Sequence, residues 1–198
     1  MSMMLRCQRC GYTYPIDTRS WQCTCGGLFE LDRVPPFQMD RVDRSDPSLW
    51  RYAALLPPVV DQHRVSLGEG LTPLLRAPHE RLNLYHKVEF LAPTGSFKDR
   101  GSTLLVSLLS AIGVDEVVED SSGNAGSSLA AYCARAGITA DIFVPEYTSP
   151  GKLAQIRVYG ANLVKIPGPR ERSAEEAHRA AEGGPYSVSY THLTLPTN

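Results

Sequence analysis

The chain has 198 residues, enough for one large domain or two small ones with a hydrophobic core. Its formal net charge is −1 with both signs interspersed, which gives no electrostatic indication of binding to nucleic acid or to an anionic membrane. No apolar run is long enough to span a membrane, and the stretch 1–6 is too short to be the apolar part of a signal peptide. We therefore expect a soluble cytoplasmic protein.

Four of the five cysteines lie near the N-terminus as two close pairs, Cys7 with Cys10 and Cys23 with Cys25, and a glycine follows each pair. Four thiolates form the closed tetrahedral site of structural zinc, and glycine lets backbone N–H groups turn toward the sulfurs. The pattern predicts a zinc-ribbon-like segment over residues 1–33, although the second pair has one intervening residue where two are commoner. A reduced loop without metal and a redox pair are the alternatives. Catalytic zinc is disfavoured because four cysteines leave no open position.

Residues 34–66 are rich in proline and charge and show no sustained hydrophobic period. We therefore expect a linker with one short helical piece at 47–55. Beyond it, residues 67–74 are punctuated by glycine and then extended before proline. Residues 84–90 alternate enough to predict a strand that leads directly into the loop containing Lys98.

Lys98 is the strongest candidate for a catalytic residue. Ser96 and Asp99 have the spacing of a capping box, which predicts a helix with Ser96 as its N-cap and Lys98 at its second position. The N-terminus of a helix carries a positive partial charge, so a protonated amine is destabilised there. A neutral amine is what a nucleophile or a Schiff base requires. The alternative is a surface lysine that extends into water.

The rest of the chain alternates between strands and helices. The pattern predicts helices at 99–112, 127–136, 150–159 and 173–182 and strands at 116–119, 140–144 and 161–166. This order is typical of an α/β fold, with a parallel sheet and helical crossovers.

The turn after the strand at 116–119 carries polar side chains. Ser121 and Ser122, with backbone N–H groups at the start of the next helix, are suited to bind an anion the size of a carboxylate. Asn124 offers a donor and an acceptor side by side, which suits a phenolic oxygen next to a Schiff base. The alternative is an ordinary helix cap.

Taken together, these features resemble the threonine synthase family, within the second fold type of pyridoxal-phosphate enzymes. The resemblance covers nearly all of residues 7–184. Its motifs are the cysteine pairs and the segments 68–74, 93–101, 121–126, 144–145 and 151–161. The lysine motif alone is shared with dehydratases and cysteine synthases, and the cysteine pairs favour the threonine synthases.

The resemblance implies a role for each candidate residue. Lys98 would bind pyridoxal phosphate and move protons at the substrate carbons, and Asn124 would hydrogen-bond the ring oxygen of the cofactor. Ser121 and Ser122 would hold the carboxylate of an amino-acid substrate. The family reaction converts O-phospho-L-homoserine and water into L-threonine and phosphate. A homodimer is expected for the full-length protein.

The end of the sequence departs from this family. Members of the family have a glycine-rich loop that binds the cofactor phosphate and a hydroxyl residue that contacts the pyridine nitrogen. This sequence contains neither, so residues 67–186 resemble the N-terminal part of the cofactor domain. Residues 187–198 do not continue the family pattern, and 189–197 resemble a translated sequencing adapter. We therefore expect a truncated fragment with a non-native tail, weak cofactor retention and no turnover.

Two other functions fit the same residues. A β-elimination or replacement enzyme such as a serine or threonine dehydratase would keep Lys98 and change the substrate. A zinc-ribbon interaction module joined to a non-catalytic α/β domain would not need Lys98.

Overall fold

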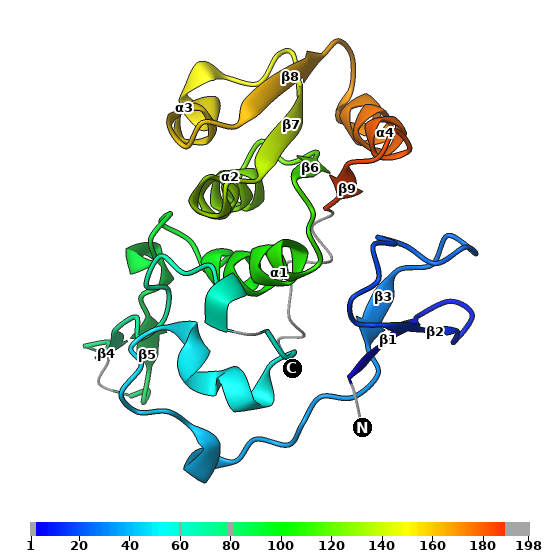
Figure 1. Cartoon of the computed structure of the whole chain (residues 1–198). Coiled ribbons are helices and arrows are strands. Elements are labelled where there is room, and N and C mark those ends of the chain that lie inside the picture. Colours follow the sequence, from blue (N-terminus) through cyan, green and yellow to red (C-terminus); the bar gives the residue numbers. More distant parts are fainter. Residues whose placement is uncertain (1–2, 60, 79–80, 189–198) are drawn as a thin grey trace.

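The computed structural model describes residues 3–59, 61–78 and 81–188, and Figure 1 shows the arrangement of its elements. In chain order, these elements are β1 (Met4–Cys7), β2 (Thr13–Pro15), β3 (Phe29–Leu31), η1 (Met39–Arg41), η2 (Leu49–Leu55), η3 (Asp61–His63), β4 (Leu74–Arg76), β5 (Tyr85–Lys87), η4 (Glu89–Leu91), α1 (Asp99–Ala111), β6 (Glu116–Glu119), α2 (Asn124–Ala136), β7 (Thr139–Pro145), α3 (Pro150–Val158), β8 (Asn162–Ile166), α4 (Arg170–Ala181) and β9 (Tyr186–Ser187). The η elements are 3₁₀-helices. None of the helices in this described part is both long and apolar enough to cross a membrane.

The predicted parallel sheet with helical crossovers is confirmed. Four strands lie in the order β8-β7-β6-β9, and all neighbouring pairs are parallel. Successive residues of a strand point to opposite faces, so Val117 and Ile142 join the cluster formed with α1, α2 and α3, while Val118 and Phe143 pack against α4. Helices therefore cover both faces, as a parallel sheet requires.

The strand expected at 84–90 forms outside this sheet. Only β5 is extended there, and it pairs antiparallel with β4 in a separate two-stranded hairpin. Tyr85, His86 and Lys87 are all exposed, and a strand with such residues cannot be buried on both faces as the strands of the main sheet are. Lys98 consequently follows a hairpin and the short helix η4, not a strand of the parallel sheet.

The segment 34–66 has more structure than a plain linker because it packs along α1. Its expected helical piece is the 3₁₀-helix η2, which starts where the N–H of Trp50 donates to Ser48 Oγ at 3.1 Å. Trp50 Nε1 then donates to Thr103 Oγ1 of α1 at 3.1 Å. The Trp50 ring packs against Val59 and Leu104.

The N-terminal segment is a three-stranded antiparallel sheet in the order β2-β1-β3, and Arg19 and Trp21 connect it to the α/β part. Arg19 donates to the carbonyl oxygens of Ile112 and Gly113, at the end of α1. The ring of Trp21 stacks on His178 of α4 with centroids 5.2 Å apart. The segment is therefore fixed to both faces of the fold.

The last described residues extend the main sheet by two positions past residue 186. Ser187 pairs with Val118 of β6, and the N–H of Val188 donates to the Val118 carbonyl at 2.8 Å. The remainder of the tail expected to be non-native, 189–198, lies outside the described residues.

Candidate active site

Lys98 lies immediately before α1 and its side chain is buried, with only 4% of the residue exposed. It occupies the N-cap position and not the second helical position, because the helix begins at Asp99. Ser96 Oγ accepts the N–H of Lys98 at 3.0 Å, so Ser96 caps the turn before the helix and not the helix itself. Lys98 Nζ lies 4.5 Å from the centre of the Phe97 ring. A surface lysine extending into water is thus contradicted, and burial keeps Lys98 a candidate nucleophile.

Asp99 does not complete a capping box with Ser96. Its carboxylate is buried and accepts hydrogen bonds from the Thr94 hydroxyl, from the Thr94 N–H at 2.7 Å and from Ser128 Oγ at 2.6 Å. Asp99 therefore joins the loop before Lys98 to helix α2. Because Asp99 directly follows Lys98 in the chain, these hydrogen bonds also fix the backbone position of Lys98.

The turn at 121–126 leads directly into α2, which begins at Asn124, three residues before the predicted start at 127. Ser121 and Ser122 are half-buried and Asn124 is exposed. Ser121 Oγ accepts the N–H of Gly123 at 3.3 Å. The polar groups of the turn therefore remain near the positively polarised start of a helix, where an anion binds favourably.

Gly126 allows the first turn of α2 to approach the backbone of this turn. A Cβ atom at that position would lie 2.1 Å from the Ser121 carbonyl oxygen and 3.2 Å from Glu119 Oε2. No side chain fits in that space. The geometry of the 121–126 turn therefore depends on glycine at this position.

The structure links Lys98 to the 121–126 turn through α2. Asp99, next to Lys98, is bonded to Ser128, one helical turn beyond Asn124. The charge of Lys98 also acts on Glu119, which lies at the end of β6 directly before the turn. The two predicted parts of the site thus belong to one region of the fold.

Glu119 is a residue of this region that the sequence analysis missed. It is 1% exposed, and within the described residues neither of its carboxylate oxygens has a hydrogen-bond partner. Burial raises its pKa well above the ordinary value, and the charge of Asp120 adds to this, whereas Arg170 and Lys98 act in the opposite direction. An acidic residue that directly follows the two buried valines of β6 was the signal that could have identified it.

The four N-terminal cysteines form a single cluster, as the spacing predicted. Their sulfur atoms all lie within 4.8 Å of one another. Cys7 and Cys25 are 3.5 Å apart and Cys10 and Cys23 are 3.6 Å apart. A Cβ atom on Gly27 would lie 2.5 Å from the Cys7 sulfur, so glycine is needed for the backbone to pass this cluster.

The surroundings of the thiols suit a divalent cation. The backbone N–H of Cys25 and the Tyr14 hydroxyl lower the pKa of Cys23 to about 6. A backbone hydrogen bond from Gly27 favours ionisation of Cys25, but burial and the other thiols outweigh it and raise that pKa to about 12. Ionising all four together is therefore opposed by their own repulsion, which a bound Zn²⁺ would remove.

Comparison with known proteins identifies the family. Residues 65–196, two thirds of the chain, match the family model described as pyridoxal-phosphate dependent enzyme. The chain belongs to this family. The match includes Lys98, Glu119 and the 121–126 turn, and the resemblance on which the sequence analysis relied is confirmed.

Curated relatives of this pyridoxal-phosphate dependent chain include several threonine synthases. It is 39% identical over 180 residues to threonine synthase of Methanocaldococcus jannaschii, covering 84% of this chain and 44% of the relative. It is 37% identical over 176 residues to threonine synthase of Methanosarcina acetivorans, covering 83% of this chain and 42% of the relative. The chain therefore spans less than half the length of these relatives.

Solved structures with other activities share the fold. An O-ureido-L-serine synthase has a TM-score of 0.54 at 32% identity, covering 59% of this chain and 40% of its own. A threonine deaminase from Solanum lycopersicum has a TM-score of 0.51 at 28% identity, covering 54% of this chain and 30% of its own. The fold alone therefore does not select a substrate.

Proposed function

We propose that this chain is part of a lyase of the threonine synthase type, which converts O-phospho-L-homoserine and water into L-threonine and phosphate. The observation that carries the proposal is the buried Lys98, fixed through Asp99 to the helix that follows the 121–126 turn. The similarity to threonine synthases over 84% of the chain supports the choice of substrate.

The residues of this region fit pyridoxal phosphate. Lys98 would bind the cofactor through Nζ, since its burial removes the amine from bulk water and places it next to the 121–126 region. Asn124, at the first position of α2, would hydrogen-bond the ring oxygen of the cofactor. When bound, the cofactor supplies an electron sink for carbanions.

The substrate would be held by the 121–126 turn. The hydroxyls of Ser121 and Ser122 and the first N–H groups of α2 would bind its carboxylate, as the charge at the start of a helix favours. Nζ of Lys98 would then take protons from the substrate carbons and return them. Burial of Glu119 behind the turn raises its pKa and so favours its protonated form.

The cysteine cluster would hold one structural zinc ion. Four sulfur ligands complete a tetrahedral site, so this metal would have no open position and no part in the reaction. Its role would be to stabilise a three-stranded sheet that is too small to have a core of its own.

Borohydride reduction in the presence of pyridoxal phosphate tests the role of Lys98. Reduction traps the cofactor covalently on the amine that binds it, so the adduct is detected even when binding is weak. Peptide mass spectrometry should find the adduct on Lys98 and none in Lys98→Ala. Lys152→Ala, which changes an exposed lysine on α3, is the matched control and should keep the adduct. Labelling of another lysine in the unmodified chain would end the assignment.

Product assays on the protein that contains this sequence test the substrate. Phosphate released from O-phospho-L-homoserine supports the threonine synthase reaction. Ammonia released from threonine without phosphate release would support the dehydratase alternative, for which the similarity to a threonine deaminase is the favouring observation. If Lys98→Ala leaves function unchanged, the interaction-module alternative replaces both.

A further inference from the structure

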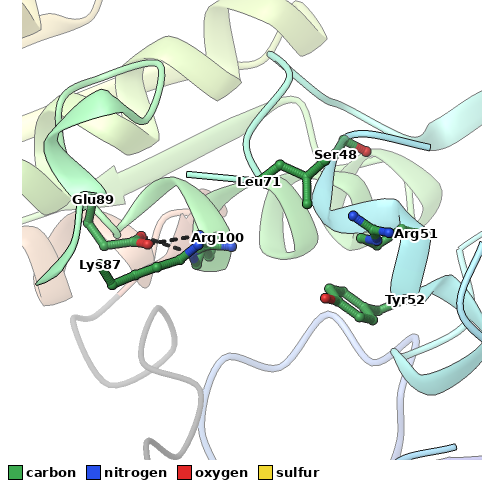
Figure 2. Close-up of a pocket in the computed structure, with 8 residues that line it drawn as sticks. Ser48, Arg51, Tyr52, Leu71, Lys87, Glu89 and Arg100 are labelled. Carbon is green, nitrogen blue, oxygen red and sulfur yellow. Dashed lines mark hydrogen bonds and ion pairs between the residues drawn. The ribbon is translucent and has the colours of Figure 1, made fainter. Parts of the chain in front are cut away.

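A cavity of about 330 Å³ lies apart from the proposed active site, between η2, the hairpin strand β5 and the first turn of α1 (Figure 2). Three cationic side chains from these elements line it: Arg51, Lys87 and Arg100. Neither Lys98 nor any residue of the 121–126 turn contributes to its lining. The cavity is therefore a separate feature of the fold.

The cavity has more positive than negative charge. Among the described residues, Glu89 is the acidic one that lines the cavity. It is already paired with Arg100, whose Nε and Nη2 donate to the two carboxylate oxygens at 2.8 and 2.9 Å. The hydrogen bonds from Arg100, with a further one from Thr72, lower the pKa of Glu89 and keep it ionised. Lys87 also acts on Glu89 through its charge. With Arg51, Lys87 and Arg100 against Glu89, the lining still carries a net positive charge.

Among the described residues, neither Arg51 nor Lys87 forms a direct ion pair. Their charges act on acidic groups only without direct contact, Arg51 on Asp43 and Lys87 on Glu89. The Lys87 ammonium donates to the Thr72 carbonyl oxygen, which carries no net charge. The Nε of Arg51 is buried and has no hydrogen-bond acceptor among the described residues. A buried donor without an acceptor is unfavourable, so the cavity is short of a negatively charged acceptor.

The backbone keeps Arg51 facing this space. Gly70 has φ +152°, and a Cβ atom on it would lie 2.6 Å from the Pro47 carbonyl oxygen. The N–H of Leu49, the first residue of η2, donates to the Glu69 carbonyl at 2.6 Å. Close contact between η2 and the 67–72 segment thus fixes one wall, and Figure 2 shows Arg51 and Tyr52 across the space from Lys87 and Arg100.

We propose that this cavity binds the phosphate or carboxylate group of a small metabolite. An arginine presents several N–H donors in a plane that matches such groups, and a lysine adds a point charge. The volume is at the lower end for ligand pockets, which limits the ligand to about the size of an amino acid. The ligand oxygens would accept hydrogen bonds from the guanidinium of Arg51 and the ammonium of Lys87. This site lies beyond the proposed reaction and does not depend on it.

Calorimetric titration of the whole chain with inorganic phosphate, at constant ionic strength maintained with chloride, tests the proposal. We expect saturable binding that Arg51→Gln or Lys87→Gln weakens roughly tenfold or more, because each removes a charged hydrogen-bond donor. Lys165→Gln changes an exposed lysine on β8 and should bind as the unmodified chain does. Circular dichroism confirms that each variant is folded.

The outcomes separate the possible sites and sources. Lys98→Ala should retain phosphate binding, whereas its loss would place the anion at the proposed active site and overturn the inference. The inference would also be overturned if the unmodified chain showed no saturable phosphate binding. The same holds if the Arg51→Gln and Lys87→Gln variants bound phosphate as tightly as the unmodified chain does. Titration with phosphoserine and with succinate then distinguishes a phosphate ester from a carboxylate as the preferred group.

Discussion

Ser128 Oγ donates a hydrogen bond to Asp99 Oδ1 at 2.6 Å, and this buried contact joins the start of α1 to α2. The same Ser128 hydroxyl lies 2.7 Å from Ser102 Oγ. Asp99 also accepts the backbone N–H of Thr94. One carboxylate therefore connects the loop that precedes Lys98 to helix α2.

Ser128→Ala should reduce the free energy of unfolding by about 1.5–3 kcal/mol, since it removes a hydrogen bond to a charged group and leaves a buried carboxylate less satisfied. Urea denaturation measures this change. Ser149→Ala is the matched control, because Ser149 is exposed and makes no side-chain cap to α3, and it should be nearly neutral. Equal effects of the two substitutions would show that the Asp99 contact adds nothing specific.

Gly126→Ala should be destabilising by about 1–3 kcal/mol, because its Cβ would overlap the Ser121 carbonyl and force the backbone to move. Gly151→Ala in α3 has no atom within 4 Å of the added carbon. It should be neutral or stabilise by up to about 1 kcal/mol through helix propensity. Thermal unfolding of both variants provides the comparison, and a tolerated Gly126→Ala would mean that the turn is less closely packed than described.

Glu119 should make the protein less stable as pH rises. Its pKa is raised in the folded state, so folding favours the protonated form, and stability falls as pH increases from the unfolded value of about 4.3 through the folded value. The slope from this group is at most about 1.4 kcal/mol per pH unit. Glu119→Gln removes this titrating group. In denaturation experiments, the free energy of unfolding of the variant should therefore increase relative to that of the unmodified chain as pH rises. Parallel stability curves for the two proteins would contradict this expectation.

The chain should bind one zinc ion, and chelation should lower its melting temperature, because metal binding free energy adds to folding free energy. Cys23→Ser should lose most of the bound metal, measured by mass spectrometry under native conditions. Cys133→Ala is the control, since Cys133 is buried in the main core far along the chain from the cluster, and it should keep the metal. Metal loss in both variants, or in neither, would argue against the four-cysteine site.

The sequence predicted the ends of helices better than their starts. Gly113, Gly137 and Gly160 each follow a helix as expected and have φ of +70°, +71° and +85°, which glycine adopts at little cost. Starts were less certain because a serine can cap a turn as readily as a helix. Ser96 does accept a backbone N–H, but that of Lys98 in the preceding turn.

Features that depend on contacts between distant segments could not be predicted from local patterns. The pairing of β5 with β4 and the binding of Ser128 to Asp99 both required the folded chain. The cavity between Arg51, Lys87 and Arg100 joins three segments with no common motif. By contrast, the cysteine cluster and the lysine loop were identified because each is contained in a short stretch of sequence.

Arg19 donates hydrogen bonds to the carbonyl oxygens of Ile112 and Gly113, which follow the last residue of α1. A helix is stiff along its axis, so α1, which Lys98 directly precedes, is held at its C-terminal end by the segment that contains the four clustered cysteines. We therefore expect oxidation of those thiols to increase the mobility of the C-terminal end of α1 first. The N-terminal end of the helix, next to Lys98, should change later.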